Sequence, residues 1–291
     1  MNWASVGTIL VLVVATLCDD FCKFSVTHKL PQVTCSNHHV TSGWETHIPA
    51  HNVEKLIFKN ITGPLDLSNL TLDSLKYLVV SHSRIDTFTL GHFPQLVFLT
   101  ITKNKKFPNL TAETLAPSTH INWLSLISNN HTLTPNAFQI LENLTWLHIQ
   151  NQKFEHLTGE FFKNSTNLHE LSIRSCHLER IDADAFDNTT DLEILSVNFN
   201  KLRHFELGTF KHLHKLKILE LHHNKFVDFN LAQFQGLVSL EVLGLPSNFL
   251  MNVCAHELVE VFPKLRKMEV KKKDARHGDV KNLIMELRGE G

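Results

Sequence analysis

The sequence predicts an α/β fold, a solenoid of about ten repeats of about 24 residues whose short strands form a curved parallel sheet on the concave face. We expect a disulfide-bonded cap at the N-terminal end and a helical cap at the C-terminal end. Three observations predict this fold. An apolar pattern returns at a nearly constant interval, phenylalanine returns at a nearly fixed phase of that interval, and hydrophobic residues make up 43% of the 291 residues, a globular composition.

Residues 1–18 are expected to be a secretory signal peptide. The apolar run Ile9–Leu17 is too short to span a membrane, and cleavage after Cys18 leaves small or uncharged residues before the cut. An uncleaved signal anchor is the alternative, because the first 18 residues contain no Lys or Arg. No second apolar run of 18 residues follows, so we expect a secreted, extracellular chain without stable membrane insertion.

Residues 19–52 precede the first repeat and are expected to form the N-terminal cap. A stack of repeats has two open apolar ends, and each end must be covered. Cys22 and Cys35 lie close together in this segment. An extracellular compartment is oxidising, so we expect a disulfide between these two residues.

Residues 53–276 are expected to form the repeats. The pattern Leu-x-x-Leu-x-Leu-x-x-Asn-x-Leu, whose first residue we call position 1, is clearest in Leu192–Leu202, Leu216–Phe226 and Leu240–Leu250. Positions 4 and 6 point inward, so each repeat should add one short strand to a parallel sheet. Position 1 falls at Val53, Leu75, Leu96, Ile121, Leu144, Leu168, Leu192, Leu216, Leu240 and Leu265.

Two further side chains recur inside the repeats. An asparagine at position 9 can bond backbone groups of neighbouring repeats, and Cys176 takes this position in the sixth repeat. A phenylalanine on the back of each repeat should join a stacked, buried spine. The asparagines are Asn104, Asn129, Asn200, Asn224 and Asn248, and the phenylalanines are Phe138, Phe162, Phe186, Phe210 and Phe234.

Residues 277–291 are expected to form the C-terminal cap. Apolar residues recur there at helical spacing, and Gly289 would end the helix. They are Val280, Leu283, Ile284 and Leu287.

This organisation resembles that of extracellular leucine-rich-repeat proteins over the whole mature length. The signal peptide, the cysteine-bearing entry, the phenylalanine backs and the closing helix resemble secreted leucine-rich-repeat immune proteins of insects, of the mosquito type that lacks a coiled coil. The resemblance implies innate-immune recognition, with another leucine-rich-repeat protein or a complement-like protein as partner. The chain departs from it at Arg276 and His277, where a tryptophan and a cysteine would be expected.

Two cysteines remain inside the repeats. Cys176 and Cys254 lie three repeats apart, about 14 Å at the usual strand spacing, which is too far for a disulfide. Cys176 is therefore expected to be a buried free thiol. Cys254 is either buried in the cap or bonded to another chain, and the resemblance implies interchain disulfides near the C-terminal cap, which would give a homodimer or a heterodimer.

Position 3 faces the concave side of the predicted sheet and carries four consecutive aromatic residues, Tyr77, Phe98, Trp123 and Trp146. Stacked about 4.8 Å apart, they could form one aromatic strip that binds a protein or a microbial glycan. A partly covered apolar row is the alternative. His148 and His222 are also candidate binding residues, and they could add positive charge on acidification, but solvent-facing polar residues are the simpler interpretation.

A cluster of basic residues lies at the C-terminal end of the repeats. An acidic partner or an anionic surface could bind there, and a solvated flank is the alternative. The cluster includes Lys267, Lys271, Lys272, Lys273 and Arg276.

Seven Asn-x-Ser/Thr sequons support an extracellular location, and each implies a surface position if it carries a glycan. They lie at Asn60, Asn69, Asn109, Asn130, Asn143, Asn164 and Asn188, so the last repeats are free of ordinary sequons.

No nucleophile elbow, phosphate-binding loop or zinc-binding helix occurs, so we expect neither an enzyme nor a cofactor or metal site. With 28 Lys and Arg against 29 Asp and Glu, the chain is not expected to bind nucleic acid. We expect a secreted, non-catalytic binding protein of innate immunity. A developmental or adhesive binder, including a soluble receptor-like decoy, and a protein inhibitor of a hydrolase are the alternatives.

Overall fold

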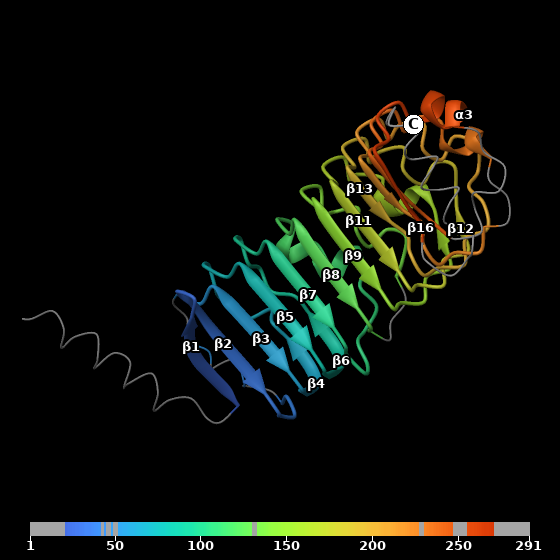
Figure 1. Ribbon diagram of the computed structural model, residues 1–291. Helices are drawn as coiled ribbons and strands as arrows, with labels where there is room; N and C mark the ends of the chain where they lie inside the picture. Colours follow the sequence, from blue (N-terminus) through green and yellow to red (C-terminus); the bar gives the residue numbers. More distant parts are fainter. Residues whose placement is uncertain are drawn as a thin grey trace, which may run out of the picture. The chain divides into compact units, whose positions relative to one another are not determined.

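The computed structural model describes residues 21–41, 44, 48, 52–129, 133–226, 230–246 and 255–270 (Figure 1). The predicted signal peptide, the predicted C-terminal cap and Cys254 lie outside these residues. The chain divides into two compact units, Met1–His131 and Thr132–Gly291, and each is described by itself.

The first unit is a sheet in the order β1-β2-β3-β5-β7-β8, in which only β1 runs antiparallel to its neighbour. On the back, β4 pairs with β6 in a second, two-stranded sheet, and a capped helical turn, α2, precedes the last strand. The elements are β1 (Cys22–Thr27), β2 (Leu30–Ser36), β3 (Lys55–Lys59), β4 (Thr62–Asp66), β5 (Tyr77–Ser81), β6 (Arg84–Thr89), β7 (Phe98–Thr102), α2 (Ala112–Leu115), a 3-10 turn (Ala116–Ser118) and β8 (Trp123–Ile127).

The second unit repeats the same design, with a parallel sheet in the order β9-β11-β13-β14-β15-β16 and a two-stranded sheet of β10 and β12 on its back. The elements are β9 (Trp146–Gln150), β10 (His156–Leu157), a 3-10 turn (Gly159–Phe162), β11 (Glu170–Arg174), β12 (Arg180–Ile181), β13 (Ile194–Ser196), β14 (Ile218–Glu220), a 3-10 turn (Leu231–Phe234), β15 (Val242–Leu245), α3 (Ala255–Val261) and β16 (Lys267–Val270).

Each repeat contributes one strand to the main sheets, and every such strand begins at position 3, which confirms the repeat register. The period-2 alternation of a strand explains which side chains are buried. In β3, for example, Leu56 and Phe58 at positions 4 and 6 are completely buried, whereas Lys55 and Ile57 are half-buried on the opposite face. That opposite face, which carries positions 3, 5 and 7, is called the strand face below.

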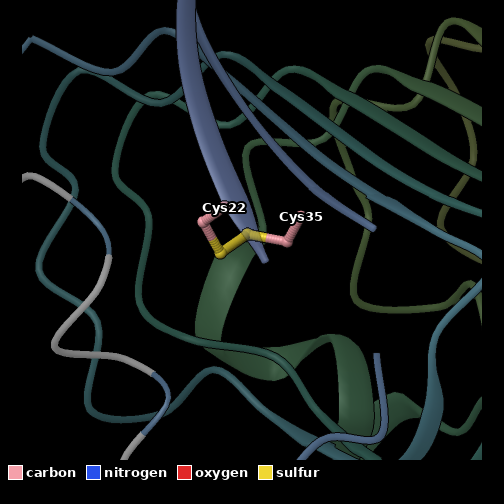
Figure 2. The surroundings of a disulfide bond; sticks show 2 residues. All are labelled: Cys22 and Cys35. Atoms are coloured by element: carbon pink, nitrogen blue, oxygen red, sulfur yellow. A yellow bond between two sulfur atoms is a disulfide. The ribbon is translucent and has the colours of Figure 1, made fainter. Parts of the chain in front are cut away.

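The N-terminal edge of the first unit is covered by a β-hairpin. Cys22 of β1 lies opposite Cys35 of β2, and their sulfur atoms form the expected disulfide (Figure 2). The indole of Trp44 packs edge-on against Phe58, with ring centres 5.3 Å apart. The hairpin and this indole together keep water from the apolar end of the first repeat, as a cap must.

The described asparagines at position 9 tie neighbouring repeats together, as their positions predict, whereas Asn248 lies outside the described residues. Asn104 Oδ1 accepts from the Ser83 N–H at 2.9 Å, and Asn104 Nδ2 donates to the Val80 carbonyl at 3.2 Å. In the second unit, Asn200 makes the same type of contacts with Cys176 and Ile173. The backbone groups of the turn that precedes each of these asparagines by one repeat are thereby satisfied by a side chain instead of by water.

Phenylalanines fill the core behind the strands. The spine residues Phe186, Phe210 and Phe234 are buried, and consecutive rings are nearly parallel with centres 6.3 and 5.7 Å apart. Phe138 and Phe162 are buried too, so the predicted role of these residues in the core is confirmed. Phe205 adds a ring that the repeat pattern did not single out, 4.7 Å from Phe210.

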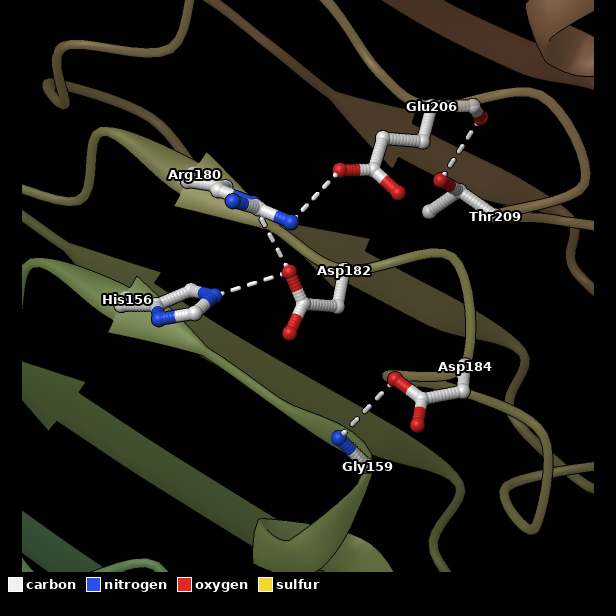
Figure 3. A network of polar contacts seen from close by, with 7 residues as sticks. All are labelled: His156, Gly159, Arg180, Asp182, Asp184, Glu206 and Thr209. Atoms are coloured by element: carbon white, nitrogen blue, oxygen red, sulfur yellow. Dashed lines mark hydrogen bonds and ion pairs between the residues drawn. The ribbon is translucent and has the colours of Figure 1, made fainter.

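Polar contacts join repeats on the surface of the second unit. Around the two-stranded sheet of β10 and β12, Asp182 accepts from His156 and Arg180 at 2.8 Å each, and Arg180 reaches Glu206 of the next repeat at 3.0 Å (Figure 3). Three ion pairs elsewhere join side chains 24 residues apart. They are Asp187–Lys211, Asp191–Lys215 and Glu193–Lys217.

Candidate functional site: the strand face

Three aromatic side chains from adjacent strands of the first unit form a column on the strand face. Tyr77, Phe98 and Trp123 begin β5, β7 and β8 and stand in register. The rings of Tyr77 and Phe98 are nearly parallel with centres 4.5 Å apart, and the indole of Trp123 lies 5.8 Å from Phe98 at 46°. All three are half-buried. We call these three residues the aromatic column.

Shorter side chains lie beside the column. Position 5 of the same strands carries Val79, Thr100 and Ser125, which also stand in register. Large aromatic side chains next to shorter, partly polar ones provide contact area at a low cost in side-chain entropy, which is typical of binding anchors.

The fourth predicted aromatic residue, Trp146, lies in the second unit, where it begins β9. It is half-buried, and its ring lies edge-on to His148 with centres 5.4 Å apart. Burial, together with the nearby positive charge of Arg174, lowers the pKa of His148, and the buried Nε2 atom has no hydrogen-bond partner among the described residues. His148 is therefore a neutral residue of this surface near neutral pH.

His222 does not face solvent as expected. Its side chain is 8% exposed, Nδ1 lies 3.1 Å from the Leu245 carbonyl, and Nε2 lies 3.8 Å from a carboxylate oxygen of Glu269. The reason is Gly244 of the next strand, where a Cβ would lie 2.5 Å from Nε2. Because Gly244 has no side chain, the imidazole can pack directly against the backbone of the next strand. Through its contacts with Leu245 and Glu269 it links three successive repeats.

Of the five residues named for the basic cluster, the structure describes Lys267, which begins β16. Its ammonium group pairs with Glu269, and the hydrogen bond from Lys267 is the main cause of the lowered pKa of that carboxyl. Lys271, Lys272, Lys273 and Arg276 lie outside the described residues.

The described sequon asparagines are all exposed, which fits their predicted use. None lies on a strand that carries the aromatic column, and Asn60 follows β3 directly. These asparagines are Asn60, Asn69, Asn109, Asn143, Asn164 and Asn188, while Asn130 lies outside the described residues.

Cys176 is a buried free thiol, as predicted. Its sulfur donates to the Arg174 carbonyl at 3.1 Å, and burial raises its pKa to about 11. A thiol that stays protonated at neutral pH is a poor nucleophile, so Cys176 has the character of a core residue.

The residue at position 8 turns the chain away from each strand with a left-handed backbone, a feature that we did not derive from the sequence. Asparagine, serine and histidine tolerate this conformation better than bulky residues do. Phe199, with φ of 59°, has the one large apolar side chain among the described residues at this position, and the residue is 42% exposed; Lys103 is the other bulky residue there. The residues at this position are Asn60, His82, Lys103, Ser128, Asn151, Ser175, Phe199 and His223.

Within the described ranges, no group of three or more His, Cys, Asp or Glu side chains is arranged to hold a metal ion. No helix in the same part of the chain has the length and apolar character that crossing a membrane requires.

Comparison with known proteins agrees with this architecture. A family model described as a leucine rich repeat matches residues 142–202 and 190–250. A chain of the octameric complex of latrophilin 3 (Lec, Olf), Unc5D (Ig, Ig2, TSP1) and FLRT2 (LRR) is similar in structure, with a TM-score of 0.64 and 20% sequence identity over 88% of this chain and 84% of that chain. A comparison with curated proteins found no match. The predicted leucine-rich-repeat solenoid is confirmed.

Proposed function

We propose that this protein is a secreted, N-glycosylated and non-catalytic binding protein, which recognises a protein partner through the strand face of its leucine-rich repeats and acts in innate-immune recognition or scaffolding. The aromatic column is the observation that carries the proposal, because Tyr77, Phe98 and Trp123 present aligned, half-buried rings on three adjacent strands. In many protein interfaces, a few aromatic side chains contribute most of the binding energy. They are buried at the centre, and the surrounding contacts keep water away from them.

The sequons support the same surface. A glycan is large and hydrated, and it would keep a partner from the surface around its asparagine. The strands of the column carry no sequon, so glycosylation at the exposed sites would leave the column accessible. The similar solved chain belongs to an assembly of several proteins, which also favours a protein over a microbial glycan as the partner.

The test is capture of partners from insect body fluid on the immobilised protein. Tyr77→Ala and Trp123→Ala should each reduce the captured amount at least about tenfold, because truncating a central aromatic anchor removes much of the binding energy. Phe24→Ala is the matched control, since Phe24 is an exposed aromatic residue of β1, away from the column. Undiminished capture by folded column variants would reject the column as the site.

The identity of the captured protein separates the classes of function. Complement-like or leucine-rich-repeat proteins support the immune role, receptor ectodomains support a developmental or adhesive binder, and a single hydrolase supports an inhibitor. Non-reducing electrophoresis of the wild type and of Cys254→Ala tests covalent dimers in the same samples. A reducible dimer that disappears in the variant would identify the protein as a subunit of a disulfide-bonded assembly.

A further inference from the structure

In the second unit, the exposed aromatic residue Phe199 lies at the carboxyl-terminal edge of the sheet, where the chain leaves the strands. Phe199 follows β13 at position 8 and adopts the left-handed backbone conformation that a bulky residue rarely takes. A residue held in an unfavourable backbone conformation while its ring remains 42% exposed gains little from burial. The other described residues at position 8 share this backbone, so the repeat imposes it, and Phe199 differs from them in presenting a large apolar ring to solvent.

The two faces of the Phe199 ring are already covered. The imidazole of His223, from the next repeat, is stacked on it with centres 4.2 Å apart at 14°. The guanidinium carbon of Arg174, from the preceding repeat, lies 5.9 Å from the ring centre. Because β11 and β14 flank β13 on opposite sides, we expect these two groups to cover opposite faces of the ring and to leave its edge exposed.

Cations are frequent in the chain segments around this ring. The segments 174–180, 198–206 and 222–226 carry five Arg and Lys residues but only two Glu residues. Arg180 pairs with Asp182 and Glu206, at 2.8 and 3.0 Å, and Lys201 pairs with Glu179 at 2.8 Å. The carboxylate of Glu220 accepts from Asn198, the residue before Phe199, at 2.7 Å. Three further cations belong to the same segments. They are Arg174, Arg203 and Lys225.

The lowered pKa of Glu179 indicates a positive electrostatic potential at this edge. A hydrogen bond from Lys201 is the main cause of its lowered pKa, and the charges of Lys225 and Arg203 lower it further. Several cations thus act on one carboxylate, and a second acidic group brought to this edge would be attracted in the same way.

We propose that the edge formed by Arg174, Phe199 and His223 is a docking surface for an acidic segment of a protein partner that carries an aromatic side chain. The edge of the Phe199 ring contacts the face of that side chain, in the edge-to-face arrangement that aromatic pairs favour. Carboxylates of the segment pair with Arg174, Arg203 and Lys225. The surface lies in the second unit and does not depend on the aromatic column.

The covered faces of Phe199 decide between a protein and a glycan. A sugar ring packs flat against the face of an aromatic side chain, and on Phe199 His223 and Arg174 already occupy both faces. An aromatic edge beside cations fits an acidic peptide better than a sulfated glycan, which offers negative charge without an aromatic ring.

The probe is a labelled peptide of about twelve residues, with one central tryptophan flanked by glutamates, and binding is measured by fluorescence anisotropy. We expect binding that weakens as salt rises from about 50 to about 300 mM, because exposed charges are screened. Phe199→Asn should reduce the affinity about tenfold or more, and Phe199→Tyr should retain it. Trp123→Ala should bind the peptide as the wild type does, which separates this surface from the aromatic column.

Two controls make the test decisive. Asparagine suits the left-handed conformation, so Phe199→Asn should melt at or above the temperature of the wild type, and a loss of affinity then reflects a lost contact. Equal affinity for a peptide with lysines in place of the glutamates, or unchanged affinity in Phe199→Asn, overturns the proposal. Heparin binding that Phe199→Asn leaves unchanged, together with no binding of the acidic peptide, assigns the cations to a sulfated glycan and also overturns it.

Discussion

The side-chain oxygen of Asn200 accepts a hydrogen bond from the backbone N–H of Cys176, one repeat earlier in the chain, at 2.9 Å. The same oxygen accepts from the Leu178 N–H at 3.1 Å, and Nδ2 donates to the Ile173 and Val197 carbonyls at 2.7 and 2.9 Å. Nδ2 also donates to the Asn198 carbonyl at 3.3 Å, so one buried amide bonds five backbone groups in two repeats. The carboxamide at position 9 thus connects neighbouring repeats through hydrogen bonds to their backbone.

Asn200→Ala should lower the free energy of unfolding by about 2–4 kcal/mol. Each buried backbone group left without a partner costs about 1–3 kcal/mol, and water in the vacated space recovers part of this. Chemical denaturation measures the change. Asn167→Ala is the control, because the Asn167 amide is exposed and bonds a single carbonyl, that of Glu142. An effect of Asn200→Ala no larger than that of the control would contradict this role.

Cys176 should not react with thiol reagents while the protein is folded. Its pKa is raised to about 11 by burial, so near neutral pH the reactive thiolate is scarce and inaccessible. Stability from this group is complete below the unfolded pKa of about 9 and is lost as the pH rises toward about 11. A colorimetric thiol assay, on a variant without Cys18 and Cys254, should detect the thiol only after urea is added. Rapid labelling of the native protein would show that the site opens.

His148 should reduce stability on acidification. Its pKa in the folded state is lowered, chiefly by burial and then by Arg174, so the unfolded chain takes up the proton first as the pH falls below about 6.5. Stability is therefore complete above that pH and is lost below it. His148→Gln should show a smaller difference in urea midpoint between about pH 7.5 and about pH 5.5 than the wild type does. His212→Gln, at an exposed position, is the matched control. An unchanged pH dependence in His148→Gln would refute the assignment.

Gly244→Ala should destabilise the protein by about 1–3 kcal/mol. The added Cβ would lie 2.5 Å from Nε2 of His222, and the buried imidazole must then move from its place near Glu269. Combining it with His222→Ala removes the clash, so the double variant should be more stable than the sum of the two single changes predicts. Thermal unfolding of all four proteins completes the cycle, and simple additivity would mean that the two residues do not oppose each other.

Repetition explains what could be predicted from the sequence. The inward positions 4 and 6, the asparagines and the phenylalanine spine follow from a period that ten repeats share, so each position was supported several times over. The strand start at Trp123, for example, follows from Ile121 alone once the register is known.

Features that occur once could not be predicted in this way. The burial of His222 depends on the missing side chain of Gly244 in a neighbouring repeat, a pairing that becomes visible only when the strands are aligned. Phe199 could have been noticed in the sequence, because a bulky residue replaces the asparagine, serine or histidine common at position 8. That this replacement is unusual becomes clear only from the left-handed backbone at this position. The covering hairpin of β1 and β2 has no repeat to support it.

The ion pairs between residues 24 apart have a consequence for how such a chain can change in evolution. Asp187–Lys211, Asp191–Lys215 and Glu193–Lys217 each join one repeat to the next. Duplication of a single 24-residue block would place like charges beside each other at these positions, whereas tandem duplication of a 48-residue block, which holds both partners, would repeat every pair in alignment. At these positions repeats can therefore be gained or lost two at a time by recombination within the gene, and new recognition surfaces can arise without a new interface between repeats.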